Sequence, residues 1–336
     1  MEYGGAGVWE SETPKLPYFH TSTLCQRGTT VSDKIVIQVE HLRKTYGSVV
    51  AVDDISFEVY EGEIFGIVGP NGAGKTTTIE CVEGLRNPDS GRISVLGLDP
   101  QRDGSALWPR IGVQLQQSAL QERVKVREVL SLFASFYPRS VDWKALMDQL
   151  GLAEKADSLF CQLSGGQKQR LFVALALVND PELVFPDEIT TGLDPQARHA
   201  MWDLIRGIRD RGKTVVLTTH FMEEAERLCD RVAIVDHGRI VALDTPSNLI
   251  RSLGVGTRVV FTMEEPLDTN ALGRSGDYGA IERDGEQIAV NCKSNQQLAQ
   301  LINTLVSDGL RFRDLRTEQP TLEDVFLAVT GRAMRD

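Results

Sequence analysis

Residues 64–78, IFGIVGPNGAGKTTT, join an apolar segment to the start of a helix through a glycine-rich loop. The loop fills the pattern G-x-x-x-x-G-K-[ST], and the segments on both sides are those that a phosphate-binding loop requires. Glycines let backbone N–H groups turn toward phosphate oxygens, and the helix start at Lys75 adds its dipole. We expect Lys75 to reach the β- and γ-phosphates of a nucleotide, and Thr76 to provide a hydroxyl ligand to Mg²⁺. The predicted phosphate-binding residues are Gly69, Pro70, Asn71, Gly72, Ala73, Gly74, Lys75, Thr76 and Thr77.

An acidic pair follows a second apolar segment, in Leu183-Val-Phe-Pro-Asp187-Glu188. A cation bound by Thr76 needs an acidic partner at the end of a neighbouring buried strand, and Asp187 fits this role. Glu188 fits the base that orients and polarises the attacking water, because catalysis of phosphoryl transfer is mainly positioning and electrostatics. Without a phosphate loop beside it, a solvated Asp-Glu pair at a strand end would be the better interpretation.

The size and charge of the chain limit the classes of function it can have. Its 336 residues suggest two domains of roughly 150 residues each. Lys and Arg total 36 against 47 Asp and Glu, so the formal net charge is −11. This balance argues against a surface that coats nucleic acid, and we expect no nucleic-acid partner.

Cysteine usage and hydropathy indicate the compartment. The five cysteines are scattered and include no C-x-x-C pair, which favours a reducing compartment and argues against structural zinc. The longest apolar run, at 171–178, is about eight residues, whereas a membrane-spanning helix needs roughly 20. The amino terminus has no signal-peptide pattern, since no continuous apolar segment follows its first basic residue, Lys15. We therefore expect a cytoplasmic protein.

The apolar periodicity predicts an α/β fold. Short β-like runs at 35–40, 55–60 and 64–69 are followed by strands that alternate with longer helical segments, which indicates a sheet of parallel strands. The segment from about 124 to 159 is mainly helical and resembles a subdomain inserted into the sheet domain. Its apolar residues at helical spacing include Leu130, Phe133, Ala134 and Tyr137.

The remainder of the chain predicts a second, smaller unit. Asp236-His237-Gly238, between apolar runs at 232–235 and 240–243, predicts a hairpin that closes the first domain. Beyond it we expect a small α+β module, whose first helix is capped by Ser294 and Gln297. The expected strands are 258–263, 287–292 and 311–317, and the expected last helix is 322–329.

A second glycine-rich helix start lies in Leu163-Ser164-Gly165-Gly166-Gln167-Lys168-Gln169-Arg170. A hydroxyl and two glycines at a helix start offer a second anion-binding terminus, although alone they would indicate only an N-capped helix. Combined with the phosphate loop and the acidic pair, this string makes residues 35–245 resemble the nucleotide-binding subunits of ATP-binding cassette (ABC) transporters. The resemblance implies that Ser164, Gly165, Gly166 and Gln167 of one subunit close on the ATP held by the phosphate loop of another, so we expect a homodimer.

Two further contacts to Mg-ATP are implied by this resemblance. Tyr46, in Arg43-Lys-Thr-Tyr46-Gly47, matches the aromatic residue that stacks on adenine, while an ordinary edge-strand tyrosine is the alternative. Gln116 matches the glutamine that contacts Mg²⁺ and couples the sheet to the helical subdomain. Its neighbours Gln114 and Gln117 are alternative ligands, since three glutamines crowd this segment.

Two more residues take roles from the resemblance. Asp194, in Thr191-Gly-Leu-Asp194-Pro195, matches the loop that crosses the dimer interface. His220 follows an apolar strand and matches the histidine that touches the γ-phosphate. The other histidines are interpreted as surface or packing residues.

Two positions depart from the family pattern. Pro186 stands where an apolar residue usually precedes the Mg²⁺ aspartate, and it removes one donor from a central strand. Ile189 replaces the usual proline after the catalytic glutamate, outside the expected ligands. Because the expected phosphate, metal and catalytic residues are all intact, we expect slow hydrolysis of ATP.

The resemblance implies a domain plan. It comprises an ABC ATPase domain over 35–248. The residues themselves predict a disordered tail over 1–34, rich in Gly, Ser, Thr and Pro without periodicity, and the α+β module over 250–336. The ATPase domain has a phosphate-loop NTPase sheet core, an antiparallel β subdomain and a helical subdomain at about 118–165.

The resemblance also implies the biological setting. The chain would energise a separately encoded transmembrane permease from the inner face of the membrane. The tail Thr321-Leu-Glu-Asp-Val-Phe-Leu-Ala-Val-Thr-Gly resembles drug, lipid or polysaccharide exporter ATPases of the daunorubicin-resistance type. The alternatives are the ATPase subunit of an importer or a soluble ABC ATPase that acts on ribosomes or nucleic acid.

Overall fold

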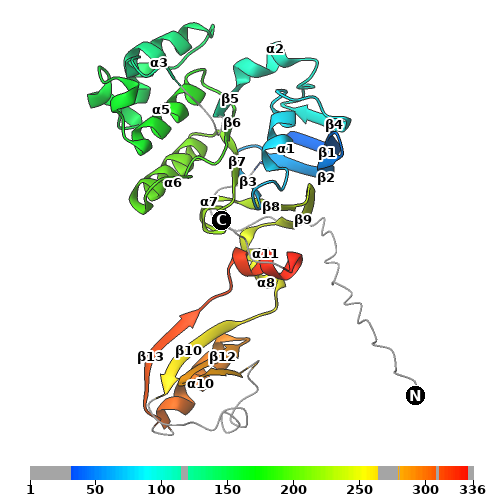
Figure 1. The fold of residues 1–336 in the computed structure, drawn as a ribbon, viewed down its shortest axis with the longest axis vertical. Helices are drawn as coiled ribbons and strands as arrows, with labels where there is room; N and C mark the ends of the chain where they lie inside the picture. The colour runs from blue at the N-terminus through cyan, green and yellow to red at the C-terminus, as the bar shows by residue number, and fades with distance from the viewer. Residues whose placement is uncertain (1–31, 115–119, 264–278, 280, 308–309, 332–336) are drawn as a thin grey trace, which may run out of the picture.

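The computed structural model describes residues 32–114, 120–263, 279, 281–307 and 310–331, and it confirms the α/β fold (Figure 1). Three sheets organise this part of the chain. Their strand orders are β2-β1-β4, β5-β6-β7-β3-β8-β9 and β11-β12-β10-β13. The first and third sheets are antiparallel, while the second is parallel except for β9. Among the described residues, no helix is long and apolar enough to cross a bilayer.

The strands of the first two sheets are β1 (Ile35–Tyr46), β2 (Val49–Tyr60), β3 (Ile64–Val68), β4 (Ser90–Val95), β5 (Ile111–Gln114), β6 (Leu183–Pro186), β7 (Thr214–Thr219), β8 (Arg231–Asp236) and β9 (Arg239–Asp244). Those of the third are β10 (Thr257–Met263), β11 (Ile281–Asp284), β12 (Gln287–Cys292) and β13 (Phe312–Glu318). The helices are α1 (Lys75–Val82), α2 (Gly104–Leu107), α3 (Val126–Ser135), α4 (Trp143–Gln149), α5 (Gly165–Leu177), α6 (Pro195–Asp210), α7 (Met222–Leu228), α8 (Pro246–Ser252), α10 (Asn295–Ser307) and α11 (Leu322–Thr330).

The six-stranded sheet is buried on both faces, which explains why its central strands are continuously apolar. Side chains alternate between faces along a strand. Phe65 and Ile67 of β3 enter a core shared with α1 and the three-stranded sheet. Ile64 and Val68 point the other way, into a core formed by α3 to α8 and α11. The sheet thus places its carboxyl edge, where β3, β6 and β7 end, between two layers.

The three-stranded sheet is larger than the sequence predicts. β1 continues from residue 40 to Tyr46, and β2 begins at Val49, six residues before the expected start. β4 was not predicted at all. The shifts of register between β1 and β2 break the regular alternation of apolar residues that sequence analysis relies on.

The helical subdomain contains α3 and α4, two short 3₁₀ helices and the start of α5. α3 ends at Ser135, so Tyr137 lies beyond the helix in which its spacing placed it. Pro138 explains this difference, because the residue before a proline disfavours helical backbone.

The predicted hairpin is confirmed as β8, a two-residue turn and β9. His237 and Gly238 have φ of 47° and 74°, the positive values that a type I′ turn requires. The carbonyl of Gly238 accepts a hydrogen bond from the Asp53 N–H at 2.7 Å. The turn is therefore bonded to β2 as well as closing the sheet.

The last helix does not stay with the carboxy-terminal sheet. α10 covers one face of that sheet, with Leu301 and Leu305 in its core. α11 instead returns to the larger domain, which contains the six-stranded sheet, and packs beside α7 and α8 (Figure 1). Leu322 and Phe326 are buried there, in the core of the larger domain. The sequence places this helix in the small module, because helical periodicity identifies an apolar face but not the surface it covers.

Candidate functional site

The phosphate loop connects β3 to α1, as the sequence predicts. Gly72 and Gly74 have φ of 80° and 100°, in the left-handed region that favours glycine. Gly74 also lies against β2, since a Cβ atom there would collide with the Ala51 carbonyl oxygen. The Gly238 N–H donates to the Ala73 carbonyl at 2.9 Å. The hairpin and β2 thus support the loop from outside.

Lys75, the first residue of α1, is only 4% exposed. Its ammonium donates to the carbonyls of Gly69 and Pro70 at 2.8 and 3.1 Å, which places the cation within the loop. Nζ also lies 3.5 Å from Oε1 of Glu188. Burial lowers the pKa of Lys75, and the nearby Glu188 carboxylate opposes this effect.

Glu188 joins the phosphate loop to the end of β7. Its Oε1 lies 3.2 Å from Nδ1 of His220, so the two residues predicted to be catalytic are in contact. Glu188 is buried and has φ of 48°, an uncommon value for a residue other than glycine. Its N–H donates to the Thr218 carbonyl at 3.2 Å. Backbone in such a sparsely populated region persists where the surroundings impose it, often at active sites.

Asp187 is 6% exposed, and its Oδ1 accepts a hydrogen bond from the Thr218 hydroxyl. Burial raises the pKa of Asp187, while Thr218 and Lys75 oppose the shift. A buried carboxylate at a strand end is a suitable oxygen donor for Mg²⁺, which commonly binds through one or two carboxylates, waters and substrate phosphates. Among the described residues, no cluster of three or more His, Cys, Asp or Glu side chains could hold a metal by itself. The single buried carboxylate of Asp187 fits a metal that phosphate oxygens would also ligate.

Pro186 is accommodated where the ladder between β6 and β7 is interrupted. Those strands pair at Leu183 and Val184, and pairing resumes only as a bridge between Asp187 and Thr218. The missing N–H of Pro186 thus falls in a gap of the β7 ladder, and the strand end still reaches Thr218.

Only one of the three candidate glutamines can be placed. Gln116 and Gln117 lie outside the described residues. Gln114 is the buried last residue of β5, and its carbonyl accepts a hydrogen bond from the Asp187 N–H at 3.1 Å. Thr76 and Thr77 are half-buried in the first turn of α1.

The second glycine-rich helix start forms a separate part of the site. The Gln167 N–H donates to Ser164 Oγ at 3.3 Å, and Gln167 Oε1 accepts from the Ser164 N–H at 2.9 Å, which makes a capping box at the start of α5. Asp194 caps α6 by accepting from the Ala197 N–H at 3.0 Å. Both starts open on a hollow of about 320 Å³. Its lining residues are Ser164, Gly165, Gly166, Gln167, Arg170, Gly192, Leu193, Asp194 and Ala197.

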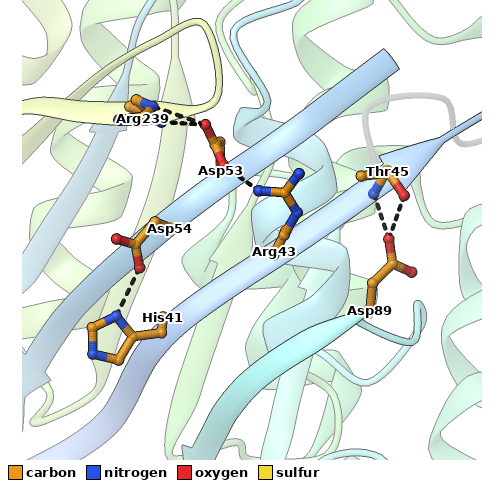
Figure 2. Close-up of polar contacts among 7 residues, drawn as sticks. All are labelled: His41, Arg43, Thr45, Asp53, Asp54, Asp89 and Arg239. Carbon is orange, nitrogen blue, oxygen red and sulfur yellow. Dashed lines mark hydrogen bonds and ion pairs between the residues drawn. The ribbon is translucent and has the colours of Figure 1, made fainter. Parts of the chain in front are cut away.

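Tyr46 ends β1 and is 41% exposed, so its ring is accessible. The Arg86 guanidinium lies 5.3 Å from the ring centroid. Figure 2 shows the ion pairs beside this strand end: Asp53 accepts from Arg43 at 2.7 Å and from Arg239 Nε at 2.9 Å. These bonds tie β1 and the hairpin to β2, next to the strand segment that supports the phosphate loop.

Thr218 is a site residue that sequence reasoning missed. Its hydroxyl donates to Asp187 and lies 3.3 Å from the Glu188 nitrogen. The available signal was its position two residues before His220 in an apolar strand, where a hydroxyl is out of pattern.

Comparisons with known proteins agree with this geometry. A family model described as ABC transporter matches residues 52–191. Nod factor export ATP-binding protein I of Ralstonia nicotianae is 38% identical over 319 residues, covering 92% of this chain and 98% of the relative. The protein of that name from Sinorhizobium fredii is 40% identical over 308 residues, covering 90% and 88%.

Two solved structures are also similar. One is an ATP-binding subunit of an ABC transporter, with 30% identity and a TM-score of 0.59 over 65% of this chain and 93% of that chain. The other is a dimeric post-hydrolysis state of an ATP-binding cassette bound to ADP and Pi, with 26% identity and a TM-score of 0.57 over 62% and 98%. A phosphate loop facing a glutamate and a histidine, together with relatives aligned over nine-tenths of the chain, shows that this protein belongs to the ABC transporter family as an ATP-hydrolysing, ATP-binding subunit.

Proposed function

We propose that this chain binds two Mg-ATP molecules as a homodimer and, from the inner face of the cell membrane, powers a separately encoded permease that exports drug-, lipid- or polysaccharide-like substrates. The observation that carries the hydrolytic part is the shared carboxylate oxygen of Glu188. It lies 3.5 Å from Lys75 and 3.2 Å from His220, at the mouth of the phosphate loop.

The residues in and around the phosphate loop have distinct roles in hydrolysis. Lys75 binds the β- and γ-phosphates, and the loop N–H groups orient them. Glu188 accepts a hydrogen bond from the attacking water and draws negative charge onto its oxygen. His220 lies beside the Glu188 carboxylate and donates toward the γ-phosphate. Thr76 and Asp187 would hold Mg²⁺, which when bound would supply positive charge beside the phosphate oxygens.

The hollow at the starts of α5 and α6 supports a dimer. None of its lining residues belongs to the phosphate-loop cluster, so these two helix starts are available to a nucleotide bound by a second copy. Ser164 and the first N–H groups of α5 would meet the γ-phosphate across the interface. ATP then stabilises the closed pair through contacts that the open state lacks.

The surface of α3 supports a membrane partner. Leu132 is 52% exposed and Phe136, just after the helix, is 64% exposed, although the opposite side of α3 is buried. Large apolar side chains that stay exposed together are typical of interaction sites. We assign this face to a cytoplasmic segment of the permease.

The direction of transport rests on the relatives. Both similar curated proteins are named as export ATP-binding proteins. An importer subunit is the second candidate, since the geometry of the site is the same for both directions.

The first test is phosphate release by the purified full-length chain with Mg-ATP, compared with Glu188→Gln. We expect turnover in the wild type, loss in the variant, and a dimer of the variant by light scattering only when ATP is present. Absence of turnover in both proteins, alone and with the permease, would refute the hydrolytic role. A monomer under all conditions would refute the dimer.

The second test uses inside-out membrane vesicles that contain this chain and the multi-span membrane protein encoded beside it. Daunorubicin, a fluorescent phospholipid and a labelled oligosaccharide serve as probes. ATP-driven uptake into these vesicles is expected for an exporter, and ATP-driven release would favour import. The double variant Leu132→Ser, Phe136→Ser should release the chain from washed membranes but keep its basal ATPase activity.

A further inference from the structure

A buried glutamate lies behind the nucleotide site, on the side away from the phosphate loop. Glu224 is in the first turn of α7, four residues after His220, and it is 1% exposed. Glutamate is rarely buried so completely without partners. Burial raises the pKa of Glu224, and the polar groups around it oppose this shift. Those groups belong to elements that carry the site residues.

The carboxyl of Glu224 faces three elements that form the site. Trp202 of α6 donates from Nε1 to Oε1 at 3.0 Å, in a buried hydrogen bond. The hydroxyls of Thr219, at the end of β7, and of Thr190, two residues after Glu188, also face it. Arg198 of α6 supplies the nearby positive charge.

Three of these partners lie within four residues of the predicted catalytic and interface residues in the sequence. Thr219 precedes His220, and Thr190 shares a tight turn with Glu188, because the Thr191 N–H donates to the Glu188 carbonyl at 3.2 Å. Arg198 is in the first turn of α6, where its N–H donates to the Asp194 carbonyl at 2.9 Å. One carboxyl thus faces neighbours of two site residues, Glu188 and His220, and lies near the positive charge of Arg198 in the helix that Asp194 caps.

The network is only partly satisfied. Within the described part of the chain, Oε2 of Glu224, Oγ1 of Thr190 and Nε of Arg198 are buried without a hydrogen-bond partner. The Arg198 guanidinium lies over the Phe221 ring, 4.6 Å from its centroid. Unpaired buried polar atoms are costly, so a small rotation of α6 that brings Arg198 onto Glu224 would be favourable.

We propose that Glu224 is a positioning residue for ATP hydrolysis that makes the loop of Glu188, the strand end of His220 and the helix start of Asp194 move as one unit. This inference rests on the proposed hydrolytic function and adds a residue that contacts neither nucleotide nor metal. When Asp194 meets the second copy across the dimer interface, α6 shifts, and Trp202 and Arg198 transmit that shift to Glu224. The catalytic pair then adopts its working geometry only in the closed dimer.

The test compares Glu224→Ala and Glu224→Gln with Glu223→Gln, a neighbouring exposed carboxylate on the same helix. Phosphate release is measured for the full-length chain over a range of Mg-ATP concentrations. We expect Glu224→Ala to lower kcat by about tenfold or more, because a misplacement of about 1 Å costs up to 10²-fold. KM should change little, because a loss of kcat with KM retained indicates an interaction made only in the transition state. Glu224→Gln keeps the acceptor for Trp202 and should recover part of the lost kcat.

A spectroscopic readout separates positioning from loss of folding and from loss of turnover. In a background of Trp9→Phe, Trp108→Phe and Trp143→Phe, Trp202 is the single tryptophan. Its emission should change on adding Mg-ATP, and Glu224→Ala should abolish that change while the circular dichroism spectrum stays the same.

The outcomes distinguish this inference from the proposed function. Equal kcat in Glu224→Ala and Glu223→Gln, or parallel loss of kcat and folded protein in both Glu224 variants, would overturn the positioning role. If the wild type itself shows no turnover, the hydrolytic proposal fails. In that case, the Trp202 emission still shows whether nucleotide binding changes the surroundings of Glu224.

Discussion

The imidazole Nδ1 of His220 lies 3.2 Å from the carboxylate Oε1 of Glu188, and the same oxygen lies 3.5 Å from the ammonium of Lys75. One oxygen atom therefore connects the phosphate loop, the end of β6 and the end of β7. Because all three side chains are at least largely buried, their interactions are weakened little by solvent. Changes to any of the three should separate ATP binding from ATP hydrolysis in a specific way.

Glu188→Gln should remove turnover and keep nucleotide binding. The amide is isosteric but cannot accept a proton from water, and general-base catalysis contributes roughly 10²–10⁴-fold in rate. We expect kcat to fall by at least about 10² while the dissociation constant of Mg-ATP changes little. Phosphate release and equilibrium binding of a fluorescent ATP analogue measure the two quantities. Weakening of both to the same extent would show that Glu188 acts in binding.

Lys75→Met, unlike Glu188→Gln, should weaken the binding of Mg-ATP itself. Its ammonium bonds the Gly69 and Pro70 carbonyls within the loop, so its loss removes the positive charge that meets the phosphates. A ligand at 100 times its dissociation constant stabilises a protein by about 2.7 kcal/mol. Saturating Mg-ATP should therefore raise the melting temperature of the wild type and of Glu188→Gln, but not that of Lys75→Met. An equal rise in Lys75→Met would contradict the role of this residue.

Phe326→Ala should destabilise the ATPase domain although the residue is near the carboxyl terminus. Phe326 is fully buried in the core that contains α7 and α8, and truncation of such a side chain typically costs about 3–5 kcal/mol. Leu327, the next residue, is 46% exposed, so Leu327→Ala is a matched control with a small expected effect. Urea denaturation followed by tryptophan fluorescence measures both. Similar stabilities of the two variants would mean that α11 does not contribute to the larger core.

The phosphate loop could be predicted from sequence because its function depends on local backbone geometry. Gly72 and Gly74 adopt the conformations their pattern requires, and the turn at His237 and Gly238 is where two apolar runs predict it. Half of the capping box predicted before α10 is present: the Gln297 N–H donates to Ser294 Oγ at 3.2 Å, whereas Gln297 Oε1 accepts from the Lys293 N–H at 2.7 Å.

The features that sequence analysis missed depend on contacts between distant segments. β4 pairs with β1 across more than 40 residues of chain, and its own sequence is mixed in polarity. The position of α11 and the partners of Glu224 are likewise set by packing. Helical spacing places Glu224 on the same face as Ala225 and Leu228, and Glu223 on the face of Arg227, but it does not identify the groups that Glu224 meets.

Glu83→Gln should change how stability depends on pH. Glu83 follows α1 and is 2% exposed, and within the described residues its Oε2 has no hydrogen-bond partner. Burial raises its pKa from 4.5 to about 9, and Asp187 and Glu80 add to the shift. The carboxyl is thus protonated in the native state at neutral pH and ionised in the unfolded state.

Between pH 4.5 and about 9, unfolding of the wild type therefore releases a proton from Glu83, so the free energy of unfolding falls as pH rises. One proton limits the slope to about 1.4 kcal/mol per pH unit. The glutamine variant lacks this contribution, so its stability relative to wild type should increase from pH 5.5 to pH 8 in urea titrations. Glu154 is exposed, so the stability of Glu154→Gln should depend on pH in the same way as that of the wild type. If the stability of Glu83→Gln instead varied with pH as that of wild type does, the pKa of Glu83 would be the same in the folded and the unfolded protein, and its carboxyl would be ionised in the native state at neutral pH.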